Sequence, residues 1–145
     1  MSKEQHYRQL ESMYLAAPIN QIFPPKIHVE KGQSTISVEM KEDYFHSAGA
    51  VHGSVYFKLL DDAAFFAANS LESTYFVLTT SFNTYITRPV TSGEMKAVGK
   101  VVNSTKSQFI VESIAYDNRG KEIARGSGIF VRGKLPLIDA KGYSA

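Results

Sequence analysis

The sequence predicts an α+β domain in which one antiparallel β-sheet wraps around a single long, buried helix. Two observations lead to this expectation. The segment 52–70 is apolar on most sides, so a helix there needs other structure around it. Much of the remaining chain alternates apolar and polar residues between clusters of Gly, Pro, Asn and Asp, as strands and turns do. A sheet folded around the helix satisfies both observations.

The chain has 145 residues, and we expect one domain over 1–145, with an N-terminal helix and linker at 1–25, a core at 27–133 and a tail at 134–145. Its 16 Lys and Arg against 14 Asp and Glu give a net charge of +2, too small to indicate a nucleic-acid partner. There is no cysteine, which excludes disulfides, thiolate metal ligands and cysteine nucleophiles. The four histidines lack metal-ligand spacing, so no metal is expected. Without a signal peptide or an apolar span, we expect a cytoplasmic protein that has no membrane partner.

The first third of the chain changes from a helical to a strand-like pattern. Leu10, Met13 and Tyr14 recur at helical spacing ahead of Pro18, which predicts a short amphipathic helix over 3–16. From Ile27 the residues alternate, as in a half-buried strand, and a hairpin turn at 31–33 divides this region into two segments.

The central helix carries two acids. Asp61 and Asp62 lie in the middle of an otherwise apolar segment, and a buried carboxylate without a partner is costly. Lys58 and Asp62 fall on one polar stripe, so we expect a surface ion pair with a solvated Asp62. Asp61 lies about 100° away from Asp62 around the helix. The pattern leaves Asp61 either as a buried acid hydrogen-bonded to a neighbouring element or as an active-site acid.

Four strand-like stretches follow, and turn residues separate them. They are 75–87, 96–102, 108–116 and 123–132. The turn at 117–120 joins the last two as an antiparallel pair, and we expect all four to be consecutive antiparallel strands. The tail from 135 is expected to be frayed.

Over roughly residues 27–133 the sequence resembles the hotdog-fold acyl-CoA thioesterases of the phenylacetate-degradation (PaaI-like) type. The most specific part is Gly49, His52 and Gly53, followed by a helix with an acid nine residues after the histidine, which is Asp61. A second part is the run from Asn83 to Pro89, NTYITRP, followed by a glycine. In the family this strand pairs with the rest of the sheet and borders the active site. The resemblance therefore implies a hotdog fold, and it favours the catalytic interpretation of Asp61.

The resemblance also implies roles for single residues. Asp61 matches the family's general base or nucleophile, and the Gly53 N–H at the helix N-terminus polarises the thioester carbonyl. His52 is either a scaffold residue or a polar contact to the substrate. Thr79 matches a Ser/Thr that positions the water and comes from the neighbouring subunit, although an ordinary strand threonine is the alternative. His46 stands where the family has an Asn that donates to the carbonyl; an imidazole can also donate.

The implied substrate is an acyl-CoA, so coenzyme A is part of the substrate and no separate cofactor is expected. Of the basic residues that could hold its phosphates, namely Arg88, Lys106, Arg125, Arg132 and Lys134, we select Arg88. The implied partner is a second copy of the chain, in a dimer or tetramer with active sites at the dimer seam. A hotdog protein that binds acyl-CoA or a lipid without cleaving it is the alternative function. A hotdog dehydratase would need a catalytic histidine in a different motif, which is not found.

Overall fold

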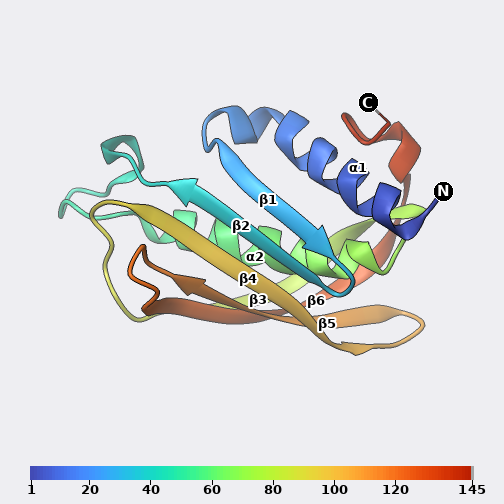
Figure 1. The fold of residues 1–145 in the computed structure, drawn as a ribbon. Coiled ribbons are helices and arrows are strands. Elements are labelled where there is room, and N and C mark those ends of the chain that lie inside the picture. The colour runs from blue at the N-terminus through green and yellow to red at the C-terminus, as the bar shows by residue number, and fades with distance from the viewer. Residues whose placement is uncertain (145) are drawn as a thin grey trace.

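The computed structural model describes residues 1–144, and its elements follow the expected order (Figure 1). The helices and single turns of 3-10 helix are α1 (Lys3–Ala16), η1 (Pro18–Gln21), η2 (Glu42–Tyr44), α2 (Gly53–Ser70) and η3 (Leu137–Asp139). The strands are β1 (Pro25–Glu30), β2 (Gln33–Glu39), β3 (Tyr75–Ile86), β4 (Glu94–Ser104), β5 (Gln108–Tyr116) and β6 (Glu122–Pro136). The helix predicted over 3–16 and the strand predicted over 108–116 are confirmed to the residue.

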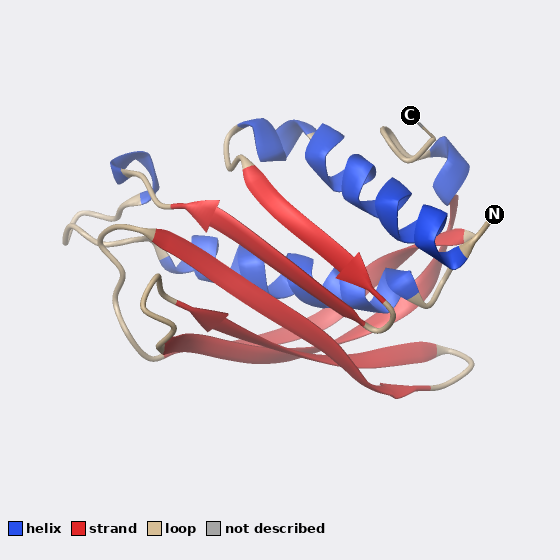
Figure 2. Ribbon diagram, viewed as in Figure 1, coloured by secondary structure: helices blue, strands red, loops and turns tan. Residues whose placement is uncertain are grey.

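One antiparallel six-stranded sheet curves around α2, in the order β1-β2-β4-β5-β6-β3 (Figure 2). This confirms the α+β hotdog architecture. The order corrects one expectation, because β3 and β4 follow each other in sequence but are not neighbours. β4 pairs with β2, whereas β3 crosses to the far edge and pairs with β6. The sequence pattern shows where strands lie but not which strands pair.

The hairpin between β1 and β2 turns at Gly32, whose φ of 69° lies in the left-handed region that favours glycine. A second glycine serves close packing. A Cβ at Gly99 of β4 would lie 2.5 Å from the Ala63 carbonyl group of α2, so the helix lies directly on the sheet backbone. The long helix is thereby brought into the concave face of the sheet.

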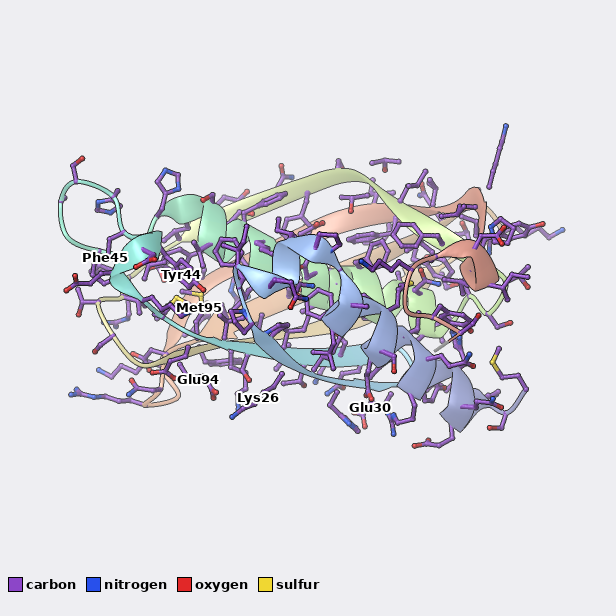
Figure 3. All side chains as sticks on the ribbon, turned by 90° about the horizontal axis from the view of Figure 1, so that it is seen from above. Lys26, Glu30, Tyr44, Phe45, Glu94 and Met95 are labelled. Carbon is purple, nitrogen blue, oxygen red and sulfur yellow. The ribbon has the colours of Figure 1, made fainter. Side chains whose placement is uncertain are left out.

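The core lies between α2 and the sheet, and the loop before α2 closes one end of it. Tyr44 and Met95 are buried in the same core cluster, at the end of the molecule where Figure 3 labels them with Phe45. Along one long side of the same view, Lys26 and Glu30 of β1 project outward. The charged outer face and apolar inner face of β1 follow its alternating pattern.

The C-terminal segment is packed, which corrects the expectation of a frayed tail. Leu137 and Tyr143 are buried. The Tyr143 hydroxyl lies 2.7 Å from Nδ1 of His6 in α1, and His6 Nε2 lies 2.8 Å from the Asn69 carbonyl oxygen at the end of α2. The two ends of the chain therefore meet at one end of the molecule (Figure 1).

Candidate active site

Helix α2 positions the candidate acid, and two strand serines hold the helix in register. Ser34 of β2 donates to the Ala63 carbonyl oxygen at 2.6 Å, and Ser113 of β5 donates to the Leu60 carbonyl oxygen at 2.8 Å. These bonds flank Asp61 along the helix. With that side of the helix held by the sheet, the Asp61 side chain points toward β3.

Thr79 of β3 meets this acid. Its hydroxyl donates a hydrogen bond to Oδ1 of Asp61 over 3.0 Å, within one chain. This corrects the expectation that Thr79 reaches the site from a neighbouring subunit. The two residues expected to act on the water are therefore adjacent in a single protomer.

An irregularity in β3 explains how Thr79 faces the helix. The pairing with β6 shifts between Thr79 and Ser81, so Thr80 is an extra residue, and its hydroxyl donates to the Ile129 carbonyl oxygen at 3.0 Å. Because the bulge adds one residue, the alternation of side chains between the two faces of the sheet shifts by one position. Thr79 before the bulge and Phe82 after it therefore both face α2. A strict period of two would have turned one of them away.

The surroundings of Asp61 make it a proton acceptor near neutral pH. Burial raises the pKa of the Asp61 carboxyl to about 6, while the hydrogen bond from Thr79 acts in the opposite direction. The acid and Thr79 lie on the wall of a cavity of about 400 Å³. A carboxyl with this pKa, at the edge of a cavity, matches the requirement for a general base at neutral pH.

Asp62 has a different environment from the one expected. Its Oδ2 lies 2.6 Å from the Lys58 ammonium and accepts a hydrogen bond from the Tyr14 hydroxyl at 2.6 Å. The Lys58 and Asp62 side chains are only 13% and 21% exposed, because α1 and η1 cover them. The predicted ion pair between Lys58 and Asp62 therefore exists. It is mostly buried rather than at the surface, and Asp62 is not solvated as expected.

Further cavity residues were missed from the sequence. Tyr14 and Asn20 line the same cavity as Asp61, although they belong to the N-terminal segment. Asn20 Oδ1 accepts from the Lys58 ammonium at 2.7 Å. No local signal links residues 38 and 44 positions apart in the chain, so only the folded structure brings them together.

A second cavity, of about 350 Å³, lies at the N-terminus of α2 and is lined by Gly53, His46 and Arg88. Gly53 is the first residue of the helix, so its N–H has no acceptor within the helix. The loop that carries Arg88 is held in place because Tyr56 of α2 donates to the Arg88 carbonyl oxygen at 2.9 Å. The structure thus groups three of the predicted site residues in one place.

The two histidines of this region differ. His46 is exposed, and its Nδ1 accepts a hydrogen bond from the Ala48 N–H at 3.1 Å, so a neutral ring carries its proton on Nε2. His52 caps α2, because its Nδ1 accepts from the Ser54 N–H at 3.0 Å. The His52 ring lies on a separate cavity that contains neither Gly53 nor His46. Within one chain, the structure shows His52 as the N-cap of α2, and a contact of its ring with the substrate stays a prediction.

The two groups of residues lie apart in a single protomer. Gly53 and Asp61 are separated by eight residues of helix, which is about 12 Å along the axis. One carbonyl group cannot contact both. Asp61 and Thr79 form what we call the base half-site, and Gly53, His46 and Arg88 form the donor half-site.

The other basic candidates for phosphate binding are engaged or lie outside both half-sites. Arg132 donates to Glu72 at 2.7 Å, and Arg125 pairs with Glu122 at 2.6 Å. Of the five, Arg88 lines the cavity of the donor half-site. Among residues 1–144, no group of three or more His, Asp or Glu side chains could hold a metal ion. None of the helices in that range is both long and apolar enough to cross a membrane.

Comparison with known structures agrees with the fold. The PaaI protein of the E. coli phenylacetic acid degradation operon superposes with a TM-score of 0.84 and 16% identity, over 92% of this chain and 97% of that one. A variant of the phenylacetic acid degradation protein PaaI from Thermus thermophilus gives a TM-score of 0.74 and 21% identity, over 81% of this chain and 100% of that one.

Sequence comparison defines the family. A candidate esterase of Saccharolobus solfataricus is 25% identical over 103 residues, which cover 71% of this chain and 69% of the relative. The model of the thioesterase superfamily matches residues 48–124, more than half of the chain, and this range contains Gly53, Asp61, Thr79 and Arg88. The chain therefore belongs to the thioesterase superfamily, a family of thioester hydrolases, and has the PaaI-like hotdog fold.

Proposed function

We propose that this protein hydrolyses an acyl-CoA thioester to the free acid and CoA, with Asp61 as the group that activates water or attacks the carbonyl carbon. The observation that carries the proposal is the position of Asp61. It is a half-buried carboxyl with a pKa of about 6, hydrogen-bonded to Thr79 and facing a cavity. Thioester hydrolysis needs a base or nucleophile of this kind.

In the general-base route, ionised Asp61 removes a proton from a water molecule as the water oxygen bonds to the carbonyl carbon. The Thr79 hydroxyl orients the carboxylate or the water. Collapse of the tetrahedral intermediate breaks the C–S bond, and the thiolate takes up a proton to leave as CoA. In the nucleophile route, an Asp61 oxygen bonds to the carbonyl carbon first, and water then cleaves the mixed anhydride.

The negative charge that develops on the carbonyl oxygen needs donors, and the donor half-site supplies them. The Gly53 N–H lies at the positive end of the α2 dipole. The His46 ring, with its proton on Nε2, is a second donor in the same cavity. We expect His46→Ala to lower turnover about 10²-fold and His46→Asn to retain most of it, as measured by thiol release. Equal turnover of His46→Ala and wild type would exclude this role.

Because the half-sites lie about 12 Å apart in one protomer, we propose that a working site forms between two copies of the chain. The free edge of β3 runs past both half-sites, from Thr79 to the loop with Arg88. Two β3 strands paired antiparallel about a twofold axis near Phe82 and Asn83 would place each base half-site beside the partner's donor half-site. The protein is thus expected to be a dimer, or a tetramer built from such dimers.

Arg88 is the proposed phosphate contact. It is exposed at the mouth of the donor cavity, where its guanidinium can pair with a phosphate of CoA. Coenzyme A is then part of the substrate, and the reaction as written balances without a further cofactor. Acyl-CoA chemistry agrees with the cytoplasmic location expected from the sequence, which cell fractionation would test.

Thiol release from a panel of acyl-CoAs, followed with a chromogenic thiol reagent, tests the proposal. Asp61→Asn keeps the size of the side chain and removes its basicity, so turnover should fall at least about 10²-fold. The matched control is Asp62→Asn, which removes a neighbouring charge and should have a much smaller effect on turnover. Comparable losses in the two variants, with folding intact, would contradict the assignment. Binding of acyl-CoA without cleavage by the wild type would instead support the non-catalytic alternative.

A further inference from the structure

The cavity beside Asp61 has walls from two parts of the chain. Phe65, Phe66 and Phe76 form the side that belongs to α2 and β3. The opposite side comes from the N-terminal segment and includes Met13, Ala17 and Ile19. These N-terminal residues lie outside the range that matches the thioesterase superfamily.

The cavity also contains charges, but these charges are already paired. The Lys58 ammonium donates to Asp62 at 2.6 Å, to Asn20 at 2.7 Å and to the Tyr14 hydroxyl at 3.3 Å, which accounts for its three N–H groups. Asn20 in turn donates to the Tyr14 carbonyl oxygen at 2.7 Å. Since Lys58 is the one basic side chain among the described residues that line the cavity, and it is fully engaged, the cavity offers no cation to a carboxylate or a phosphate.

The position of the cavity relates it to the reacting carbon. Asp61 and Thr79 lie on its wall, so a thioester whose carbonyl carbon lies at Asp61 has its acyl group beside or inside the cavity. The walls beyond the acid are mostly aliphatic and aromatic. Such a space favours an uncharged hydrocarbon group.

Resting on the proposed function, we infer that this cavity binds the acyl group, that it selects uncharged hydrocarbon acyl groups, and that Ala17 of the N-terminal segment sets the limit on their size. Ala17 is the smallest side chain on that wall and is half-buried at the C-cap of α1. Its backbone is extended, with φ of −63° and ψ of 134°, so a larger side chain fits without backbone strain.

The test compares kcat/KM for straight-chain acyl-CoAs from acetyl to decanoyl in the wild type, Ala17→Phe and Leu15→Phe. Phe at 17 takes up part of the cavity and shortens the space left for the acyl chain, so we expect octanoyl-CoA to lose at least about tenfold while acetyl-CoA changes little. Leu15→Phe is the matched control, because Leu15 lies two residues before Ala17 in the last turn of α1, is exposed and does not line the cavity. An acyl preference in Ala17→Phe that equals that of the wild type would overturn the inference.

A comparison of a charged with an uncharged acyl group tests the inference that the cavity selects uncharged groups. Butyryl-CoA and succinyl-CoA have the same number of acyl carbons, but the succinyl group carries a carboxylate that would be desolvated near Asp61. We expect the wild type to favour butyryl-CoA by at least about tenfold. A preference for succinyl-CoA would contradict an uncharged acyl site.

A binding measurement distinguishes a failure of this inference from a failure of the proposed function. S-octyl-CoA is a thioether that cannot be hydrolysed, and its affinity can be measured by calorimetry for the wild type and both Phe variants. Failure of the wild type to cleave any acyl-CoA refutes the proposed function. If S-octyl-CoA still binds the wild type and Leu15→Phe more tightly than Ala17→Phe, the acyl site stands. Equal affinity in all three proteins would overturn it.

Discussion

The two edge strands of the sheet, β1 and β3, differ in whether their outward-facing backbone N–H and C=O groups have hydrogen-bond partners. At the β1 edge, side chains of α1 take the place of a neighbouring strand. The Val29 N–H donates to the Glu11 carboxylate at 2.8 Å, and Arg8 donates to the Val29 carbonyl oxygen at 2.6 Å. At the β3 edge, no element within residues 1–144 pairs with the outer side of a strand of 12 residues.

The β3 edge also carries apolar side chains that face solvent in one protomer. Leu78, Tyr85 and Ile86 are 51%, 65% and 47% exposed. A long, apolar, unpaired edge is a surface for pairing with another chain, whereas a capped edge is not. The contrast shows that β1 is capped by its own chain, and the open β3 edge supports the proposal that a second copy pairs there, on the side of the molecule where both half-sites lie.

The largest expected effect comes from placing charge on the open edge. Leu78→Lys combined with Tyr85→Lys puts like charges at the proposed seam and should convert the oligomer to a monomer of 16.1 kDa. Separation of the half-sites removes the oxyanion donors, so turnover should fall about 10²–10³-fold. Light scattering on a sizing column gives the mass, and thiol release gives the turnover.

The control for this pair of substitutions lies on the β1 edge. Glu30→Lys changes an exposed residue of β1, and we expect no change in mass or turnover. A wild type that is monomeric at micromolar concentration and still cleaves acyl-CoA would rule out the role of the β3 edge.

A smaller effect, on stability, is expected from removing the Glu11 side chain that caps the β1 edge. Glu11→Ala leaves the buried Val29 N–H without its acceptor and should lower the free energy of unfolding by about 1–3 kcal/mol. Glu11→Gln retains an acceptor oxygen and should keep most of the stability. Urea unfolding measures both variants. Equal stability of Glu11→Ala and wild type would show that the cap is not needed.

The smallest effect concerns Asp61, on the open side of the molecule. Its pKa is raised to about 6 in the folded chain by burial, so the folded state binds more protons than the unfolded state between about pH 4 and 6. Stability from this group is therefore lost as pH rises through that window. Asp61→Asn should raise the melting temperature at pH 7–8 and leave it unchanged at pH 4. An equal shift at both pH values would contradict this assignment of the pKa.

Much of the fold followed from local periodicity. The amphipathic spacing of α1 and the apolar run of α2 predicted both helices within one residue at each end, because these signals repeat over several turns. The pairing of β3 with β6 did not follow, since strand pattern carries no information on partners. The packed tail was missed because Tyr143 is buried through contact with His6, 137 residues away.

The site was predicted unevenly for similar reasons. Asp61 stood out because a charge in an apolar helix conflicts with burial, whereas Gly53 and His46 were identified through the family resemblance. Helical geometry alone already places Gly53 about 12 Å from Asp61, and this separation is the basis of the proposal that the working site forms between two chains. The bulge at Thr80 and the contacts of Tyr14 and Asn20 depend on tertiary packing, and no local pattern indicates them.

Complementation between two inactive variants tests most directly whether the site is shared by two chains. Asp61→Asn disables the base half-site. Gly53→Pro deletes one N–H at the first helical position, where proline is tolerated, and His52 already has φ of −63° and ψ of 142°, as a residue before proline requires. Each variant alone should be inactive. After subunit exchange in an equal mixture, half of the dimers are mixed and each contains one intact site, so about a quarter of the wild-type turnover should return. No recovery in a mixture shown to contain mixed dimers would contradict the shared site.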